Sequence, residues 1–193
     1  MQIAVYGGSF NPPHIVHAMV ASWLIWSRIV DEVWLVPVYH HAFEGMQEKK
    51  LVDFQQRMLW CSQMSVISEK IRVCDIESHL PTPSYSIDTL QALQRQHPEH
   101  QFRLVVGSDV VSQLPLWKSW EQIQALFTPI IVGRVGFEGA NQDMVFPNIS
   151  STELRKSLQQ NVIPEQWLLA EIADALKVKN PYFLNNNPPK SRE

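Results

Sequence analysis

The residues best suited to chemistry lie near the N-terminus, where residues 7–17 run Gly-Gly-Ser-Phe-Asn-Pro-Pro-His-Ile-Val-His. The apolar residues 3–6 before this segment predict a buried strand, and the glycine pair lets the backbone approach a ligand closely. His14 and His17 are three residues apart, so in a first helical turn both side chains point the same way. Free N–H groups at a helix start attract phosphate, and two imidazoles add further donors. The segment therefore predicts a phosphate site at a strand–helix junction.

A second candidate lies at residues 149–155, with the sequence Ile-Ser-Ser-Thr-Glu-Leu-Arg. Ser150 or Ser151 can cap a helix here, and the hydroxyls at the cap and in the first turn can donate to phosphate oxygens. Arg155 lies one turn further on and can reach the same oxygens through its planar guanidinium. The alternative is a plain helix cap with Arg155 in solvent.

Size and composition limit the classes of protein. A chain of 193 residues, 45% of them apolar, fits a single domain with a sizeable core. Its net charge of −3 favours no broad nucleic-acid surface, although a local basic pocket remains compatible with it. The two cysteines, Cys61 and Cys74, fit no metal-binding spacing and are expected as free thiols. No signal peptide and no bilayer-spanning run is visible, so we expect a cytoplasmic protein without a membrane partner.

Strand-like and helix-like segments alternate along the chain. Six segments predict strands: Gln2–Tyr6, Glu32–Pro37, Ile71–Cys74, Phe102–Val106, Pro129–Val132 and, weakly, Met144–Phe146. Six segments predict helices: His14–Ile29, Val52–Ile67, one capped by Ser86 and ending at Gln96, Trp120–Phe127, one capped by Ser150 or Ser151, and Glu165–Leu176.

This alternation predicts an α/β fold, a single Rossmann-like domain with a doubly wound parallel sheet. We expect the domain to cover residues 1–179 and residues 180–193, rich in asparagine and proline, to form a poorly ordered tail. Ligands bind such sheets at the carboxyl ends of the strands, which brings together the loops after Tyr6, Pro37, Val106 and Val132.

The first motif matches neither the P-loop nor the GxGxxG pattern. It resembles the GxFxPxHxGH signature of the HIGH-type nucleotidylyltransferases, with Val16 where that family usually has glycine. The second motif is similar to the ISSTxxR signature of the same superfamily, in the same order along the chain.

Three further segments resemble the nicotinate and nicotinamide mononucleotide adenylyltransferases within that superfamily. Residues 84–90, Ser-Tyr-Ser-Ile-Asp-Thr-Leu, are similar to their SYTxDTL segment. Residues 107–109 and 114–120 resemble their GxD…LPxWxxW segment, and residues 132–136 resemble their RPG turn, with Val135 in place of proline. The resemblance covers roughly residues 3–160.

The resemblance implies that the 5′-phosphate of a pyridine mononucleotide attacks the α-phosphorus of ATP, giving the dinucleotide and pyrophosphate in NAD biosynthesis. The substrate phosphate serves as nucleophile, so catalysis consists of positioning and charge stabilisation. The sequence agrees, because it offers phosphate donors but no evident nucleophile–base pair. Mg²⁺ is expected with ATP, held mostly by phosphate oxygens and water. No metal site made of protein ligands is expected.

By the same resemblance, His14, His17 and Arg155 are the catalytic residues, holding phosphates and the charge of the transition state. The residues implied in ATP binding are Gly8, Ser9, Phe10, Gly107, Asp109, Arg134, Ser151 and Thr152. Among these, Asp109 is implied to take ribose hydroxyls, and Arg134 to lie near a phosphate or the adenine edge, a surface salt bridge being its alternative.

For the mononucleotide, the resemblance implies that Trp117 stacks on the pyridine ring, while Tyr85 and Ser86 offer backbone groups to the ring substituent. A core tryptophan is the alternative for Trp117. Bacterial family members commonly carry PPHK after the second strand, and residues 38–50 depart from this. His41, Lys49 or Lys50 could supply the missing cation, and we assign Lys49 to the mononucleotide site.

Two other functions compete with this one. A phosphopantetheine-type adenylyltransferase shares the first motif but would not explain residues 84–90 or the paired tryptophans. A non-catalytic nucleotide-binding or sensor protein on the same fold is suggested only by Val16 and Val135. The sequence does not distinguish a monomer from a homo-oligomer, nor the acid from the amide mononucleotide.

Overall fold

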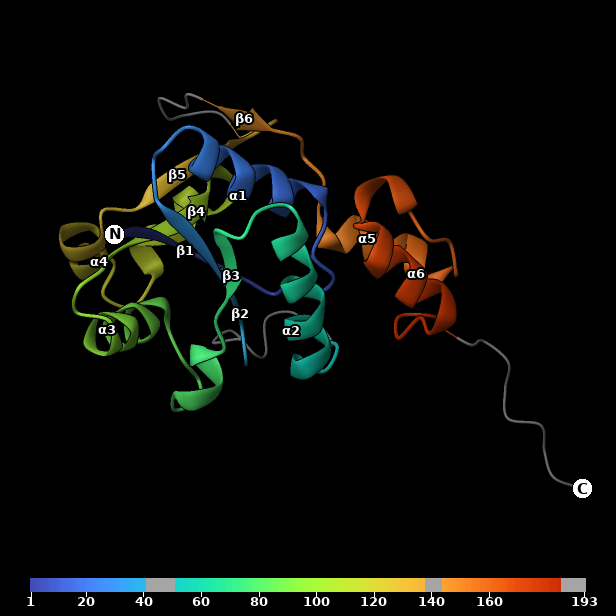
Figure 1. Cartoon of the computed structure of the whole chain (residues 1–193), viewed down its shortest axis with the longest axis horizontal. Coiled ribbons are helices and arrows are strands. Elements are labelled where there is room, and N and C mark those ends of the chain that lie inside the picture. The colour runs from blue at the N-terminus through green and yellow to red at the C-terminus, as the bar shows by residue number, and fades with distance from the viewer. Residues whose placement is uncertain (41–50, 138–143, 185–193) are drawn as a thin grey trace, which may run out of the picture.

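The computed structural model describes residues 1–40, 51–137 and 144–184, which contain one six-stranded sheet (Figure 1). All neighbouring strands pair in parallel, in the order β3-β2-β1-β4-β5-β6. The strands are β1 Gln2–Gly8, β2 Glu32–Pro37, β3 Ile71–Val73, β4 Gln101–Gly107, β5 Ile130–Arg134 and β6 Val145–Phe146. The strand order reverses between β1 and β4, so the predicted doubly wound parallel sheet is confirmed.

The strand β1 shows how the sheet is buried on both faces. Ile3 and Val5 point into the core cluster shared with α3 (Ser86–Gln96) and α4 (Trp120–Phe127). Ala4, between them, points into the other cluster, which α1 (Ile15–Trp26) and α2 (Phe54–Ser62) share. Since side chains alternate along a strand, one apolar run supplies both cores, as expected for a parallel sheet covered by helices on both sides.

The helices on the second face are shorter than predicted. The helix α1 spans Ile15–Trp26, not His14–Ile29, because Arg28 adopts a positive φ of 55° that ends the helix. The predicted helix Val52–Ile67 is α2 at Phe54–Ser62, followed by a 3₁₀ turn. Asp53 caps α2 by accepting two backbone N–H bonds, which explains the later start.

Two other expectations need correction. The predicted helix Glu165–Leu176 is a short 3₁₀ turn at Glu165–Trp167 and a separate helix, α6, at Ala170–Val178. Residues between Gly107 and Trp117 form an unpredicted 3₁₀ segment, Ser108–Leu116, which carries the chain from β4 to the tryptophan pair. Within the described ranges, no helix is both long and apolar enough to cross a bilayer.

The C-terminal helices lie beside the sheet rather than over it (Figure 1). The helix α5, Ser151–Gln159, and α6 share a small core with Trp60 of α2 and with Tyr182. Tyr182 is buried, its hydroxyl donates to Asn11 Oδ1 at 2.8 Å, and Asn180 donates to Leu158 O at 2.7 Å. The first residues of the expected tail are therefore part of the fold, whereas residues 185–193 lie outside the described chain.

Tyr182→Phe removes one buried hydrogen bond and leaves Asn11 Oδ1 with one fewer donor. We expect a loss of about 1 kcal/mol in the free energy of unfolding, or roughly 2–4 °C in Tm. Thermal unfolding of both proteins measures it, with Phe183→Leu, at the neighbouring exposed residue, as the control. An unchanged Tm would show that the tyrosine hydroxyl does not tie the C-terminus to the N-terminal motif.

Candidate active site

A cavity of about 760 Å³ opens at the carboxyl ends of β1, β4 and β5. It is lined by every proposed site residue in the described chain: Gly8, Ser9, Phe10, His14, His17, Tyr85, Ser86, Gly107, Asp109, Trp117, Arg134, Ser151, Thr152 and Arg155. Lys49, also assigned to the site, lies outside the described residues, as do His41 and Lys50. Residues up to 147 positions apart in sequence thus line one cavity, as expected for ligand sites at the carboxyl ends of parallel strands.

The two histidines are fixed by the start of α1. His14 is the N-cap residue, and its backbone N–H donates to Nδ1 of His17 at 3.0 Å. This bond leaves Nε2 of the neutral His17 ring to carry the proton. The two rings face each other with centroids 3.8 Å apart. Val16, in the place of the family's glycine, needs no positive φ and is buried in the core cluster of α1.

Both imidazoles are neutral in the free protein at neutral pH. Burial, followed by the positive charge of Arg134, lowers the pKa of His14 to about 3. Burial also lowers the pKa of His17 well below its usual value, with His14 and Arg134 adding to the effect. In the described chain, Nδ1 of His14 is buried without a hydrogen-bond partner. Such a group costs free energy unless a ligand binds it.

The helix α5 brings a second set of donors to the cavity. Ser150 is its N-cap, accepting from the Glu153 N–H, which settles the choice between Ser150 and Ser151. The Ser151 hydroxyl donates to Pro12 O at 3.1 Å. Arg155 donates to Asn11 O at 2.9 Å and to the Thr152 hydroxyl at 3.0 Å. The expected phosphate-binding groups of α5 therefore also hold the N-terminal motif in place, and Arg155 is not a free surface residue.

The sequence motifs assign no role to Arg57, or to Asn11 within the first of them. Arg57 is almost fully buried and donates to Ser9 O at 3.0 Å and to Val52 O at 2.8 Å. Asn11 is fully buried, and its side-chain oxygen accepts from the Val52 N–H at 3.1 Å. An arginine on the apolar side of a predicted helix is the one signal that could have indicated a buried role.

The turn after β4 holds Asp109 against Arg134. A β-carbon at Gly107 would collide with the Asp109 carboxylate, so a side chain there would force that carboxylate to move. Arg134 Nη1 donates to Asp109 Oδ2 at 3.1 Å, and the Arg134 N–H donates to the Ser108 hydroxyl. The pair is largely buried and lines the cavity, so the salt bridge considered for Arg134 exists but is not a surface one. Val135, in place of proline, donates its N–H to Phe146 O, which proline could not do.

The start of α3 and the segment around Trp117 also line the cavity. Tyr85, not Ser86, is the N-cap residue of α3, and its N–H donates to Oδ2 of Asp88 in the first turn. Trp117 is half-buried and meets Trp120 edge-on, with centroids 6.2 Å apart. The indole packs against the core and also lines the cavity. Trp117 can therefore be a core residue and a stacking residue at the same time.

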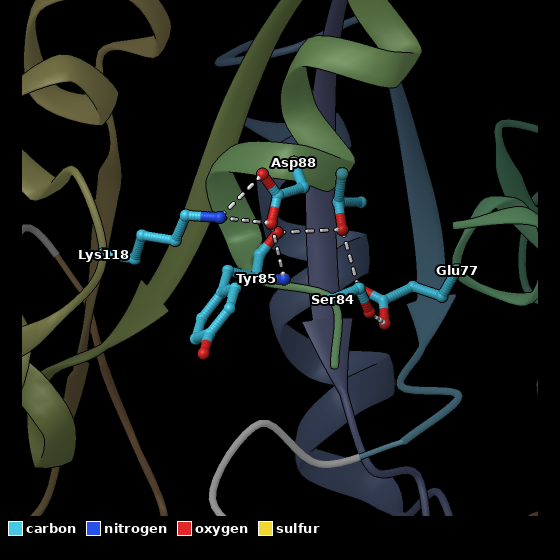
Figure 2. A network of polar contacts seen from close by, with 6 residues as sticks. Glu77, Ser84, Tyr85, Asp88 and Lys118 are labelled. Carbon is cyan, nitrogen blue, oxygen red and sulfur yellow. Dashed lines mark hydrogen bonds and ion pairs between the residues drawn. The ribbon is translucent and has the colours of Figure 1, made fainter. Parts of the chain in front are cut away.

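Glu77 also lines the cavity and supports the start of α3, and no motif predicts it. The carboxylate is buried and accepts from the hydroxyls of Ser84 and Thr89, both at 2.7 Å (Figure 2). The Glu77 carboxylate thus holds Ser84, which precedes α3, and Thr89, which lies within it. The segment 84–89 is therefore held in a defined position.

The strand order, the glycine-rich junction between β1 and α1, and the convergence of two helix starts on one cavity define a nucleotide-binding protein of the Rossmann-like class. The chain belongs to the cytidylyltransferase-like family, whose model matches residues 5–157.

Comparison with individual proteins shows which members of this family the chain is similar to. The chain is 37% identical over 175 residues to a probable nicotinate-nucleotide adenylyltransferase of Anaeromyxobacter sp. (strain K), covering 86% of this chain and 91% of the relative. It is 30% identical over 190 residues to the protein of the same name from Myxococcus xanthus, covering 97% and 98%. In fold it is similar to the Plasmodium falciparum nicotinic acid mononucleotide adenylyltransferase complexed with NaAD, with a TM-score of 0.76, 23% identity and coverage of 94% and 97%.

His14 is buried in its neutral form, so the free energy of unfolding depends on pH. The unfolded chain binds a proton at this histidine below about pH 6.5, whereas the folded chain does so only near pH 3, so stability falls as the pH drops through this window. Between pH 7 and pH 5 we expect wild type to lose about 2 kcal/mol more than His14→Gln, at up to about 1.36 kcal/mol per pH unit.

Urea unfolding at pH 7 and pH 5 measures this difference. The control is His79→Gln, because His79 is exposed and forms an ion pair with the exposed Asp75, four positions before it. Equal pH dependence of wild type and His14→Gln would contradict the neutral, buried state of His14.

Proposed function

We propose that this protein transfers the adenylyl group of ATP to nicotinate mononucleotide, releasing pyrophosphate and forming the dinucleotide used in NAD biosynthesis. The relatives named as nicotinate-nucleotide adenylyltransferases, matched over most of both chains, support this activity. The structural observation that carries it is that His14, His17 and the start of α5 line the same cavity as Tyr85 and Trp117.

The cavity has separate ends suited to the two substrates. Imidazoles, hydroxyls and the Arg155 guanidinium at one end are donors for the triphosphate. The mononucleotide would occupy the end formed by Trp117 and the start of α3, with its 5′-phosphate directed at the α-phosphorus. A bond forms between that phosphate oxygen and the α-phosphorus, and the bond to the leaving pyrophosphate breaks.

Neutral imidazoles suit this chemistry. A donor that carries no charge before the reaction gains interaction energy as negative charge builds up on the phosphoryl oxygens, so it stabilises the transition state more than the bound substrate. His17, held through its Nδ1, presents Nε2–H as such a donor. The unpartnered Nδ1 of His14 is a second group that substrate can satisfy.

Mg²⁺ is part of the proposal. The cavity offers nitrogen and hydroxyl donors, and its two carboxylates in the described chain are both engaged, Asp109 with Arg134 and Glu77 with the hydroxyls of Ser84 and Thr89. These residues fit an ion that is held by phosphate oxygens and water, and that supplies charge neutralisation when bound.

A cytoplasmic location is also proposed, supported by the free thiols of Cys61 and Cys74.

The direct test is to incubate the protein with ATP, Mg²⁺ and nicotinate mononucleotide, and to measure the dinucleotide and pyrophosphate. We expect His17→Ala to lower kcat by on the order of 100-fold or more, because one donor to developing charge is lost. His79→Ala, at an exposed histidine outside the cavity, is the control. A folded His17→Ala protein with near-normal kcat would contradict the role of His17, and the absence of product from wild type would contradict the proposed function.

Trp117→Ala separates ring stacking from core packing. Loss of stacking should raise the KM for the mononucleotide roughly 5- to 150-fold while changing that for ATP little, as expected for 1–3 kcal/mol of base stacking. Trp26→Ala is the matched control, because Trp26 is 87% exposed and does not line the cavity. A large fall in Tm with both KM values changed alike would assign Trp117 to the core.

A further inference from the structure

Lys118 joins the two segments that form the proposed mononucleotide end of the cavity. Its ammonium lies 3.1 and 3.2 Å from the two carboxylate oxygens of Asp88 in α3, and 4.5 Å from the ring centroid of Tyr85 (Figure 2). Lys118 immediately follows Trp117 and itself lines the cavity. The ion pair therefore connects the segment that carries the proposed stacking residue, Trp117, with the first turn of α3.

The ion pair contributes little to folding. The side chains of Lys118 and Asp88 are 48% and 35% exposed, and ion pairs at such positions stabilise proteins weakly. The position of α3 also does not depend on it, because the buried carboxylate of Glu77 holds Ser84 and Thr89 from behind. Asp88 is held independently by the Tyr85 N–H. Removing the lysine thus changes charge more than geometry.

Asp88 presents a difficulty for an acidic substrate. A helix start attracts anions through its free N–H groups, but the Asp88 carboxylate in the first turn of α3 opposes this attraction. Asp88 does not itself line the cavity, but it contacts two residues that do, Tyr85 and Lys118. If the ring substituent approaches Tyr85 and Ser86, a nicotinate carboxylate would therefore lie near a like charge. Lys118 is the cation paired with that charge.

We propose that Lys118 determines preference for the acid mononucleotide by neutralising Asp88, so that the start of α3 accepts a carboxylate. The inference rests on the proposed function and assigns the selectivity of that same site to a named ion pair. Lys118 acts through Asp88 and not on the reacting atoms, so it is a specificity residue and not a catalytic one.

The experiment compares kcat/KM for nicotinate and nicotinamide mononucleotides in wild type and Lys118→Met, which keeps the length of the side chain. We expect the acid-to-amide ratio to fall roughly 5-fold or more, because one uncompensated charge about 4 Å away has this effect in water and a larger one at the lower dielectric constant of a protein surface. Raising the salt concentration should restore part of the ratio, because the site is solvent-accessible.

Charge and packing are separated by three further variants. Lys118→Arg should keep the ratio, and Lys118→Met combined with Asp88→Asn should restore it, because both charges are then absent. Lys177→Met removes a lysine from an exposed ion-pair network on α6 that does not line the cavity, and should leave the ratio unchanged.

Each outcome is decisive. A ratio that is unchanged in Lys118→Met, or not restored in the double variant, overturns the inference even though wild type is active. Equal losses for both mononucleotides together with a lower Tm would assign Lys118 a structural role and overturn it too. Wild type that makes neither dinucleotide would refute the proposed function itself.

Discussion

A single hydrogen bond at the start of α1 determines what the N-terminal motif can do. The His14 N–H is one of the helix-start donors that lack an intrahelical partner, and His17 Nδ1 accepts it at 3.0 Å. The bond satisfies the backbone, fixes the His17 ring and selects the protonation of its other nitrogen. Burial then keeps both imidazoles neutral by lowering their pKa values. The proposed donors to phosphate are therefore prepared by folding before any substrate binds.

The turn between β1 and α1 depends on segments far away in sequence. Ser9 O accepts from Arg57 of α2, and Asn11 O accepts from Arg155 of α5. The Asn11 side chain accepts from Tyr182, near the end of the described chain. Two guanidinium groups and a tyrosine hydroxyl thus donate hydrogen bonds to polar groups that the turn buries. The small C-terminal core is part of the site's construction, since it places Tyr182 and α5 against this turn.

Local pattern and motif predicted much of the fold and most of the cavity. The strand β2 and the helix α4 have the predicted bounds, since a continuous apolar run and a clear helical period determine each locally. The strand-end rule brought residues from the described motifs to one cavity. The Arg28 conformation that ends α1 was not predictable, nor was the choice of Tyr85 over Ser86 as N-cap, because both depend on tertiary context.

Buried polar partners were the main omission. Arg57, Glu77 and Tyr182 have no motif of their own, and each has its role only because the fold supplies partners 7 to 171 residues away. The double use of Arg155, as a proposed phosphate ligand and as a support for Asn11, could likewise not be inferred from a cap signature. Pairing between distant segments is a property of the packed structure and not of local sequence.

The proposed chemistry depends on His17 being a neutral, Nε2-protonated donor at working pH. Nitrogen-15 NMR of the imidazoles distinguishes the neutral tautomers from the imidazolium through the shifts of the two ring nitrogens. At pH 7 we expect His17 to show an unprotonated Nδ1 and a protonated Nε2, and to titrate well below the usual range of a histidine because burial lowers its pKa. A His17 ring that is protonated at both nitrogens at pH 7, or that carries its proton on Nδ1, would contradict the account.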